Sequence, residues 1–191
     1  MRRFVNPGNA AFEVAVNSQI YVDKTGLLAY TNSVINTKQA LICSSRPRRF
    51  GKSITADMLC AYYSRGCDSD SIFASYEIAK SDSYKKHLNQ YDVIYLDIQW
   101  CMMDAGSAEQ TVSYLNYHVI EELKEIYPQI LLDGIRTAYG AMSCINAQTG
   151  VKFIVIIDEW DVLIRDEAAN EAVLQDYINF FARNVQGQRT Y

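Results

Sequence analysis

The stretch Ser45-Arg46-Pro47-Arg48-Arg49-Phe50-Gly51-Lys52-Ser53-Ile54 stands between two segments with different hydrophobic patterns. An apolar run at residues 40–43 precedes it, and a segment with helical periodicity, residues 54–63, follows it. A strand, a tight loop that ends in Gly-Lys-Ser, and a helix form the layout of a phosphate-binding loop. The stretch therefore predicts an α/β protein with an anion site at the start of a helix.

The residue types in this loop suit a bound phosphate. N–H groups at a helix N-terminus favour an anion, Lys52 can neutralise phosphate charge, and the Ser53 hydroxyl can reach Mg2+. The candidate nucleotide-binding residues are Arg46, Pro47, Arg48, Arg49, Phe50, Gly51, Lys52, Ser53 and Ile54. Arg46 departs from the general consensus, which has its first glycine at that position. Support for the prediction must therefore come from the rest of the chain.

The composition indicates a globular protein, and we expect one domain over residues 1–191. Hydrophobic residues make up 49% of the chain and charged residues 21%, which excludes a disordered protein. The net charge of −4 argues against a surface that coats nucleic acid. We expect contact with nucleic acid only indirectly, if at all.

The cysteines and the apolar runs predict a cytoplasmic protein without a membrane segment. The five cysteines are odd in number and contain no C-x-x-C pair, which favours free thiols in a reducing compartment. No apolar run is long enough to span a bilayer, because the best candidate is bracketed by Lys152 and Asp158. The start of the chain lacks the apolar core of a signal peptide.

Hydrophobic patterns predict the other elements. We expect strands at 12–16, 92–98 and 152–161, helices at 27–34, 108–127, 130–144 and 166–184, and an irregular connection with a helical turn at 72–87. Asp23 or Thr25 is expected to cap the helix at 27–34. His118 is expected to be a packing or surface residue rather than a ligand.

A second chemical signal ends the strand predicted at 152–161. Its apolar run ends in Asp158-Glu159, the pattern of a Walker B strand. In P-loop proteins the Asp orders Mg2+ through its water shell, and the Glu polarises the attacking water. Carboxylates at a strand end can also be merely solvated. Together with Gly-Lys-Ser, however, they predict a nucleotide site at the C-terminal edge of a parallel sheet, where open α/β proteins bind ligands.

Three strings together resemble one family of bacterial proteins, the AAA-ATPase-like family. They are Tyr21-Val22-Asp23-Lys24-Thr25, the loop from Arg46 to Ser53, and Ile157-Asp158-Glu159-Trp160-Asp161. The resemblance covers nearly the whole chain from about Phe12 onward, and the family itself has Arg at the position of Arg46. Many members carry a C-terminal nuclease-like domain of the restriction-endonuclease type.

The resemblance implies an ATP-binding, Mg2+-dependent hydrolase with Walker A and Walker B motifs. It implies that Lys52 and Ser53 bind phosphate and Mg2+, that Asp158 binds the metal, and that Glu159 is the hydrolytic base. The resemblance implies ATP rather than GTP as the nucleotide. The chain contains no guanine-specific Asn-Lys-x-Asp string. The pair Asp23-Lys24 is a family feature to which the sequence assigns no role.

The resemblance also implies a three-layer P-loop fold of the additional-strand class, with a mainly parallel sheet. Family members continue into a further strand with a Thr-Gly sensor motif, and this chain ends at Tyr191, before that strand. We therefore expect a truncated sheet that lacks its central strand, and a protein partner or self-association that completes it. Unpaired groups on buried strand edges cost about 1 to 3 kcal/mol each.

Two other functions remain open from the sequence. One is a nucleotide switch or degraded ATPase that binds without hydrolysis, because no sensor residue completes the site. The other is a binding module of a nuclease-linked defence or mobile-element system. Arg46, Arg48 and Arg49 suit phosphate contact, a solvated loop or contact with another macromolecule equally well.

Overall fold

The computed structural model describes residues 2–44, 50–166 and 169–186. The chain divides into two compact units, which are described separately. The first contains residues 6–93, and the second contains residues 2–5 together with the chain from residue 94 onward. Within the described residues, no helix is both long and apolar enough to cross a membrane.

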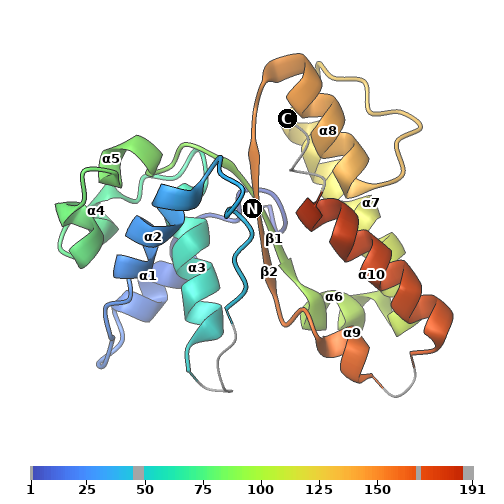
Figure 1. Ribbon diagram of the computed structural model, residues 1–191, viewed down its shortest axis with the longest axis horizontal. Coiled ribbons are helices and arrows are strands. Elements are labelled where there is room, and N and C mark those ends of the chain that lie inside the picture. Colours follow the sequence, from blue (N-terminus) through green and yellow to red (C-terminus); the bar gives the residue numbers. More distant parts are fainter. Residues whose placement is uncertain (1, 45–49, 167–168, 187–191) are drawn as a thin grey trace. The chain divides into compact units, whose positions relative to one another are not determined.

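The first unit is helical and has an aromatic core. Its elements are α1 (Ala10–Val16), α2 (Gly26–Val34), α3 (Lys52–Tyr63), α4 (Asp70–Phe73), the 3-10 helix η1 (Glu77–Lys80) and α5 (Tyr84–His87). Helix α1 packs on α3 (Figure 1), and α2 packs on η1. Phe73 stacks on Phe12 at 5.1 Å between ring centroids and meets Tyr62 edge-on at 5.3 Å. The buried face of α3 is thus fixed by aromatic contacts.

The second unit contains a mixed α/β core. Its elements are β1 (Asp92–Asp97), whose first two residues belong to the first unit, α6 (Ile98–Ala105), α7 (Ala108–Ile126), α8 (Ala138–Thr149), β2 (Phe153–Asp158), α9 (Val162–Arg165) and α10 (Glu171–Gln186). Strands β1 and β2 pair in parallel in a two-stranded sheet. Helix α10 packs on both α7 and α8 (Figure 1).

Helix α7 confirms the predicted helix at 108–127. Its stripe of Val112, Leu115, Val119, Ile120 and Leu123 is buried in the core of the second unit. The Ser107 hydroxyl caps the helix by accepting a hydrogen bond from the N–H of Gln110 at 3.3 Å. The predicted strands at 92–98 and 152–161 are confirmed in type as β1 and β2, but the first ends at Asp97 and the second ends at Asp158, before a turn at 159–161.

The strand expected at residues 40–43 is not formed. These residues have no regular structure, and Leu41 and Ile42 are 38% and 44% exposed. A strand needs hydrogen-bond partners along its edge, and the described part of the chain offers none to this segment. The sheet that the described residues form is therefore smaller than the multi-stranded sheet that we expected.

Two further predictions were wrong in type or extent. Residues 12–16 belong to helix α1, because Phe12 is buried against Phe73 whereas Val14 is exposed. The helix expected at 130–144 begins only at Ala138. The Thr137 hydroxyl caps it by accepting from the N–H of Gly140, and the Asn116 side chain accepts from the N–H of Ala138. Residues 130–137 thus form a loop.

Candidate functional site

The Gly-Lys-Ser sequence lies at the start of α3, as predicted. Gly51 has a left-handed conformation (φ 74°) and precedes the helix, while Lys52 and Ser53 form its first turn. The Gly51 carbonyl accepts hydrogen bonds from the Thr55 N–H at 3.0 Å and from the Thr55 hydroxyl at 2.9 Å. The first turn of α3 contains no acidic residue and no side-chain cap. Its N–H groups are therefore not used by an acidic side chain of that turn.

Arg46, Pro47, Arg48 and Arg49 lie outside the described residues. Phe50 is described, and its ring is exposed. Ile54, the last predicted loop residue, is exposed on the first turn of α3.

Lys24 contacts this loop from a distant part of the sequence. Its ammonium Nζ donates a hydrogen bond to the Phe50 carbonyl at 2.8 Å. A Cβ atom added to Gly51 would lie 2.9 Å from the same Nζ. The sequence marked Lys24 within Tyr-Val-Asp-Lys-Thr but assigned it no role, and only the fold brings it to the start of α3.

Thr25 occupies the N-cap position of α2, as one of the two alternatives predicted, but neither its side chain nor that of Asp23 makes a capping hydrogen bond to the helix. The Asp23 carboxylate accepts hydrogen bonds from the N–H groups of Thr25 (2.8 Å) and Glu77 (3.0 Å). The buried Thr25 hydroxyl accepts from the N–H of Ile78 at 3.1 Å. Burial by itself raises the pKa of Asp23, but the N–H donors of Glu77 and Thr25 outweigh it and hold the pKa below its ordinary value. Residues 23–25 are therefore fastened to η1.

Asp158 ends β2 and is nearly fully buried, with 6% exposure. Its Oδ1 accepts a hydrogen bond from the Glu159 N–H at 2.9 Å. Its Oδ2 is buried and has no hydrogen-bond partner among the described residues. A buried carboxylate oxygen without a partner is costly, and a bound cation or water is the usual remedy.

Glu159 follows in a conformation that is rare for a residue with a side chain, with φ 49°. Such backbone strain occurs preferentially at functional sites. Its carboxylate forms an ion pair with Arg165 on α9, at 3.5 Å between Oε2 and the guanidinium. The next residue, Trp160, accepts a hydrogen bond through its carbonyl from the Tyr177 hydroxyl at 2.6 Å. The turn after β2 is thus held by α9 and α10.

Asp97 is a third carboxylate at this end of the sheet, which the sequence reasoning did not select. It ends β1 and caps α6 by accepting from the N–H of Trp100 at 3.0 Å. Burial, followed by the nearby charges of Asp158 and Glu159, raises the pKa of Asp97 above its ordinary value. A signal was present in the sequence: Asp97 follows an apolar strand just as Asp158 does, and parallel strands end at one edge of the sheet.

The chemistry of Asp158 fits a magnesium ion. Magnesium usually binds one or two protein carboxylates and otherwise keeps waters and phosphate oxygens. The buried, unpartnered Oδ2 of Asp158 supplies one such ligand. No group of three or more His, Cys, Asp or Glu side chains is gathered for a metal within the described ranges. A cage made wholly of protein ligands is thus not found there.

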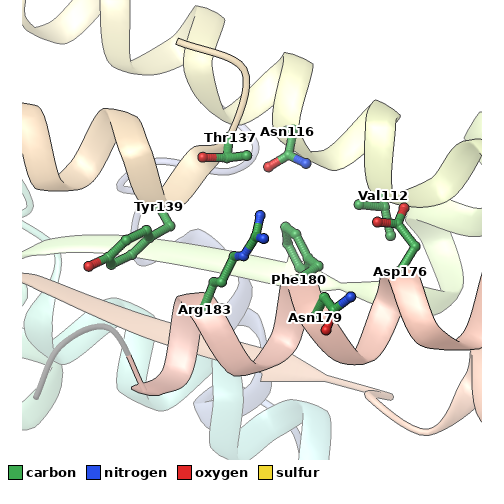
Figure 2. Close-up of a pocket in the computed structure, with 8 residues that line it drawn as sticks. All are labelled: Val112, Asn116, Thr137, Tyr139, Asp176, Asn179, Phe180 and Arg183. Carbon is green, nitrogen blue, oxygen red and sulfur yellow. The ribbon is translucent and has the colours of Figure 1, made fainter.

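A small polar cavity lies among α7, α8 and α10 in the second unit (Figure 2). Its volume of about 90 Å³ is well below the range of roughly 300–1,000 Å³ for ligand pockets. Its lining includes Asn116, Asp176 and Arg183 but none of the predicted site residues. We therefore do not assign the nucleotide to this cavity.

Comparisons with curated proteins and with solved structures gave no match. A family model described as "Predicted AAA-ATPase" matches residues 10–187. The match includes the start of α3, the end of β2 and the segment that carries Lys24. The chain therefore belongs to the AAA-ATPase-like family.

Proposed function

We propose that the chain is a Mg2+-dependent ATP-binding domain that hydrolyses ATP. The observation that carries the proposal is the start of α3, where Gly51 turns the backbone and Lys52 and Ser53 occupy a first turn free of acidic residues. This arrangement favours an anion, and membership of an ATPase-like family makes a nucleotide phosphate the anion of choice.

Each residue has a separate role in this proposal. Lys52 neutralises phosphate charge, and the loop from Arg46 to Ile54 supplies N–H groups to the phosphates. Ser53 and Asp158 are each assigned as an Mg2+ ligand by the resemblance to the family, and Glu159 orients and deprotonates the attacking water. When bound, Mg2+ neutralises charge on the phosphates and polarises their oxygens.

Calorimetry with ATP and Mg2+ tests the binding. We expect Lys52→Ala to weaken ATP binding by at least about tenfold, because it removes a charge-assisted phosphate contact. Lys38→Ala is the matched control, since Lys38 is exposed in the same unit. Equal ATP affinity of wild type and Lys52→Ala, or no ATP binding by either, contradicts the assignment.

Phosphate release tests hydrolysis. We expect Glu159→Gln to lower turnover by about 100-fold or more with little change in ATP affinity, because it removes the base. Glu125→Gln, an exposed change on α7, serves as control. Turnover of Glu159→Gln equal to that of wild type would exclude Glu159 as the base.

One observation favours a second function, a nucleotide switch that binds without turnover. Arg165 holds the Glu159 carboxylate in an ion pair. A carboxylate oxygen that contacts a guanidinium is less available to accept a hydrogen bond from an attacking water. Nucleotide binding by wild type without phosphate release above that of Glu159→Gln would support the switch.

We also propose the finer features that the resemblance implies. These are one functional domain over residues 1–191, the three-layer additional-strand class, a cytoplasmic location, and a protein partner or second copy that completes the sheet. The exposed apolar residues Leu41 and Ile42 support a partner for that segment. Light scattering after gel filtration tests self-association, and a monomer at all concentrations contradicts it.

A further inference from the structure

Lys24 is placed where a side chain on Gly51 would otherwise be. Its ammonium lies 2.8 Å from the Phe50 carbonyl oxygen and 2.9 Å from the position of a Cβ on Gly51. Phe50 and Gly51 directly precede the first turn of α3. The ammonium thus adjoins the backbone that presents Lys52 and Ser53.

The segment that carries Lys24 is held on both sides. Asp23 accepts hydrogen bonds from the N–H groups of Thr25 and Glu77, and the Thr25 hydroxyl accepts from Ile78. Thr25 is fully buried. Because the neighbours of Lys24 are already ordered, less entropy is lost when its side chain takes one position.

The helix itself does not favour a positive charge at this place. A cation near a helix N-terminus is repelled by the partial positive charge of the helix. Lys24 and Lys52 both lie at this end of α3, whose first turn has no acidic residue. A negatively charged phosphate at this helix end would attract both lysines.

We propose that Lys24 is a second phosphate-directed lysine of the nucleotide site, which also positions the loop through the Phe50 carbonyl. This inference rests on the proposed function above. The Phe50 carbonyl takes one of the three ammonium protons, and the others can be donated to phosphate oxygens. The role explains why Asp23 and Thr25 fasten this segment to η1.

Calorimetry of the Lys24 variants with ATP, ADP and AMP in the presence of Mg2+ tests the proposal. Lys24→Arg keeps the charge, Lys24→Gln keeps an N–H donor without charge, and Lys24→Met keeps neither. We expect Lys24→Arg to bind ATP within about threefold of wild type and the two neutral variants to lose about tenfold. The loss should be smaller for AMP, which carries fewer phosphate charges.

Three results overturn the proposal. If Lys24→Gln binds ATP with wild-type affinity and Lys24→Met binds it more weakly, the role of Lys24 is limited to the hydrogen bond with the Phe50 carbonyl. Equal losses for AMP and ATP would exclude the phosphate contact. Wild-type affinity in all three variants would remove Lys24 from the site and leave the proposed function standing.

Failure of the proposed function gives a different pattern. In that case wild type and Lys52→Ala bind no ATP, and the phosphate role of Lys24 fails with them. Lys38→Gln, an exposed change in the same unit, is the control for a general loss of positive charge. Thermal unfolding of each variant shows whether a change in affinity reflects a change in folding.

Discussion

At the scale of single residues, two features of the structure favour glycine at position 51: its backbone conformation and the space beside it. Its positive φ of 74° is costly for any residue with a Cβ, and the space where a Cβ would stand adjoins Lys24 Nζ. The positive φ is a property of the backbone, whereas the limited space results from the contact between Lys24 and Phe50. Substitution at Gly51 therefore affects both stability and the proposed phosphate site.

We predict that Gly51→Ala lowers the free energy of unfolding by about 1 kcal/mol. Gly66→Ala is the matched control, because Gly66 has a φ of 84° and open space around its Cβ position. Both variants should lose similar stability in urea unfolding, since the Lys24 side chain can move. Only Gly51→Ala should also weaken ATP binding, and equal ATP affinity of the two variants would contradict this.

Asp97 provides a prediction on pH. Its pKa is raised in the folded protein, so between the unfolded pKa of 3.8 and the folded pKa the folded state binds more protons than the unfolded state. Ionisation of Asp97 therefore lowers the free energy of unfolding as the pH rises from the unfolded pKa to the folded pKa. The protein remains less stable by this amount at neutral pH. The substitution Asp97→Asn would keep the cap on α6 without the charge.

Asp97→Asn should accordingly be more stable than wild type at pH 7, with the difference vanishing below about pH 4. Urea unfolding in EDTA at several pH values measures this. Asp97→Ala, which loses the cap as well, should be about 1 kcal/mol less stable than Asp97→Asn. A wild type that is more stable than Asp97→Asn at pH 7 would show that the charge is favourable.

At the scale of elements, Glu122 on α7 fastens the start of the chain. Its carboxylate accepts hydrogen bonds from the N–H groups of Arg3, Phe4 and Val5 at 2.7–2.9 Å. These bonds hold residues 3–5 beside β1, where Val5 and Ile94 form an antiparallel bridge. One side chain thus satisfies three backbone donors of a short edge segment.

We predict that Glu122→Ala lowers the free energy of unfolding by about 2–4 kcal/mol, because three backbone N–H groups, two of them in part-buried hydrogen bonds, lose their acceptor. Glu121→Ala is the control. Glu121 forms an ion pair with Lys124 on the surface of the same helix, which contributes at most about 1 kcal/mol. Chemical denaturation measures both, and similar losses in the two variants would contradict the anchoring role.

At the scale of the whole molecule, the reactivity of the cysteines distinguishes the folded from the unfolded protein. All five are free, and Cys43 is exposed whereas Cys60 and Cys101 are buried. Burial raises the pKa of Cys60 well above its ordinary value and raises the pKa of Cys101 to about 12. The reactive thiolate is therefore scarce at both buried positions.

We predict that alkylation at pH 8 labels Cys43 first and labels Cys60 and Cys101 only when the protein unfolds. Mass spectrometry after a short pulse of reagent, with and without urea, measures the order. Cys67 and Cys144, which are partly exposed, should react at intermediate rates. Labelling of Cys60 in the absence of urea as fast as Cys43 would show that the aromatic core of the first unit opens readily.

Much of the fold could be predicted where neighbours in sequence decide it. The apolar stripe of α7, its Ser107 cap and the apolar runs of β1 and β2 are all local patterns. The segment at 40–43 could not be predicted, because its apolar run indicates a strand while its state depends on whether another strand is beside it. The late start of α8 also depends on Asn116, which lies far away in sequence.

The sequence by itself determined the family, the amphipathic helices and the residue types at the two proposed chemical positions, Gly51-Lys52-Ser53 and Asp158-Glu159. Only the tertiary structure decided that Lys24 reaches the Phe50 carbonyl, that Asp97 joins Asp158, and that Oδ2 of Asp158 is buried without a described partner. The reason is physical. Periodicity and turns come from adjacent residues, whereas burial and charge depend on segments that folding brings together.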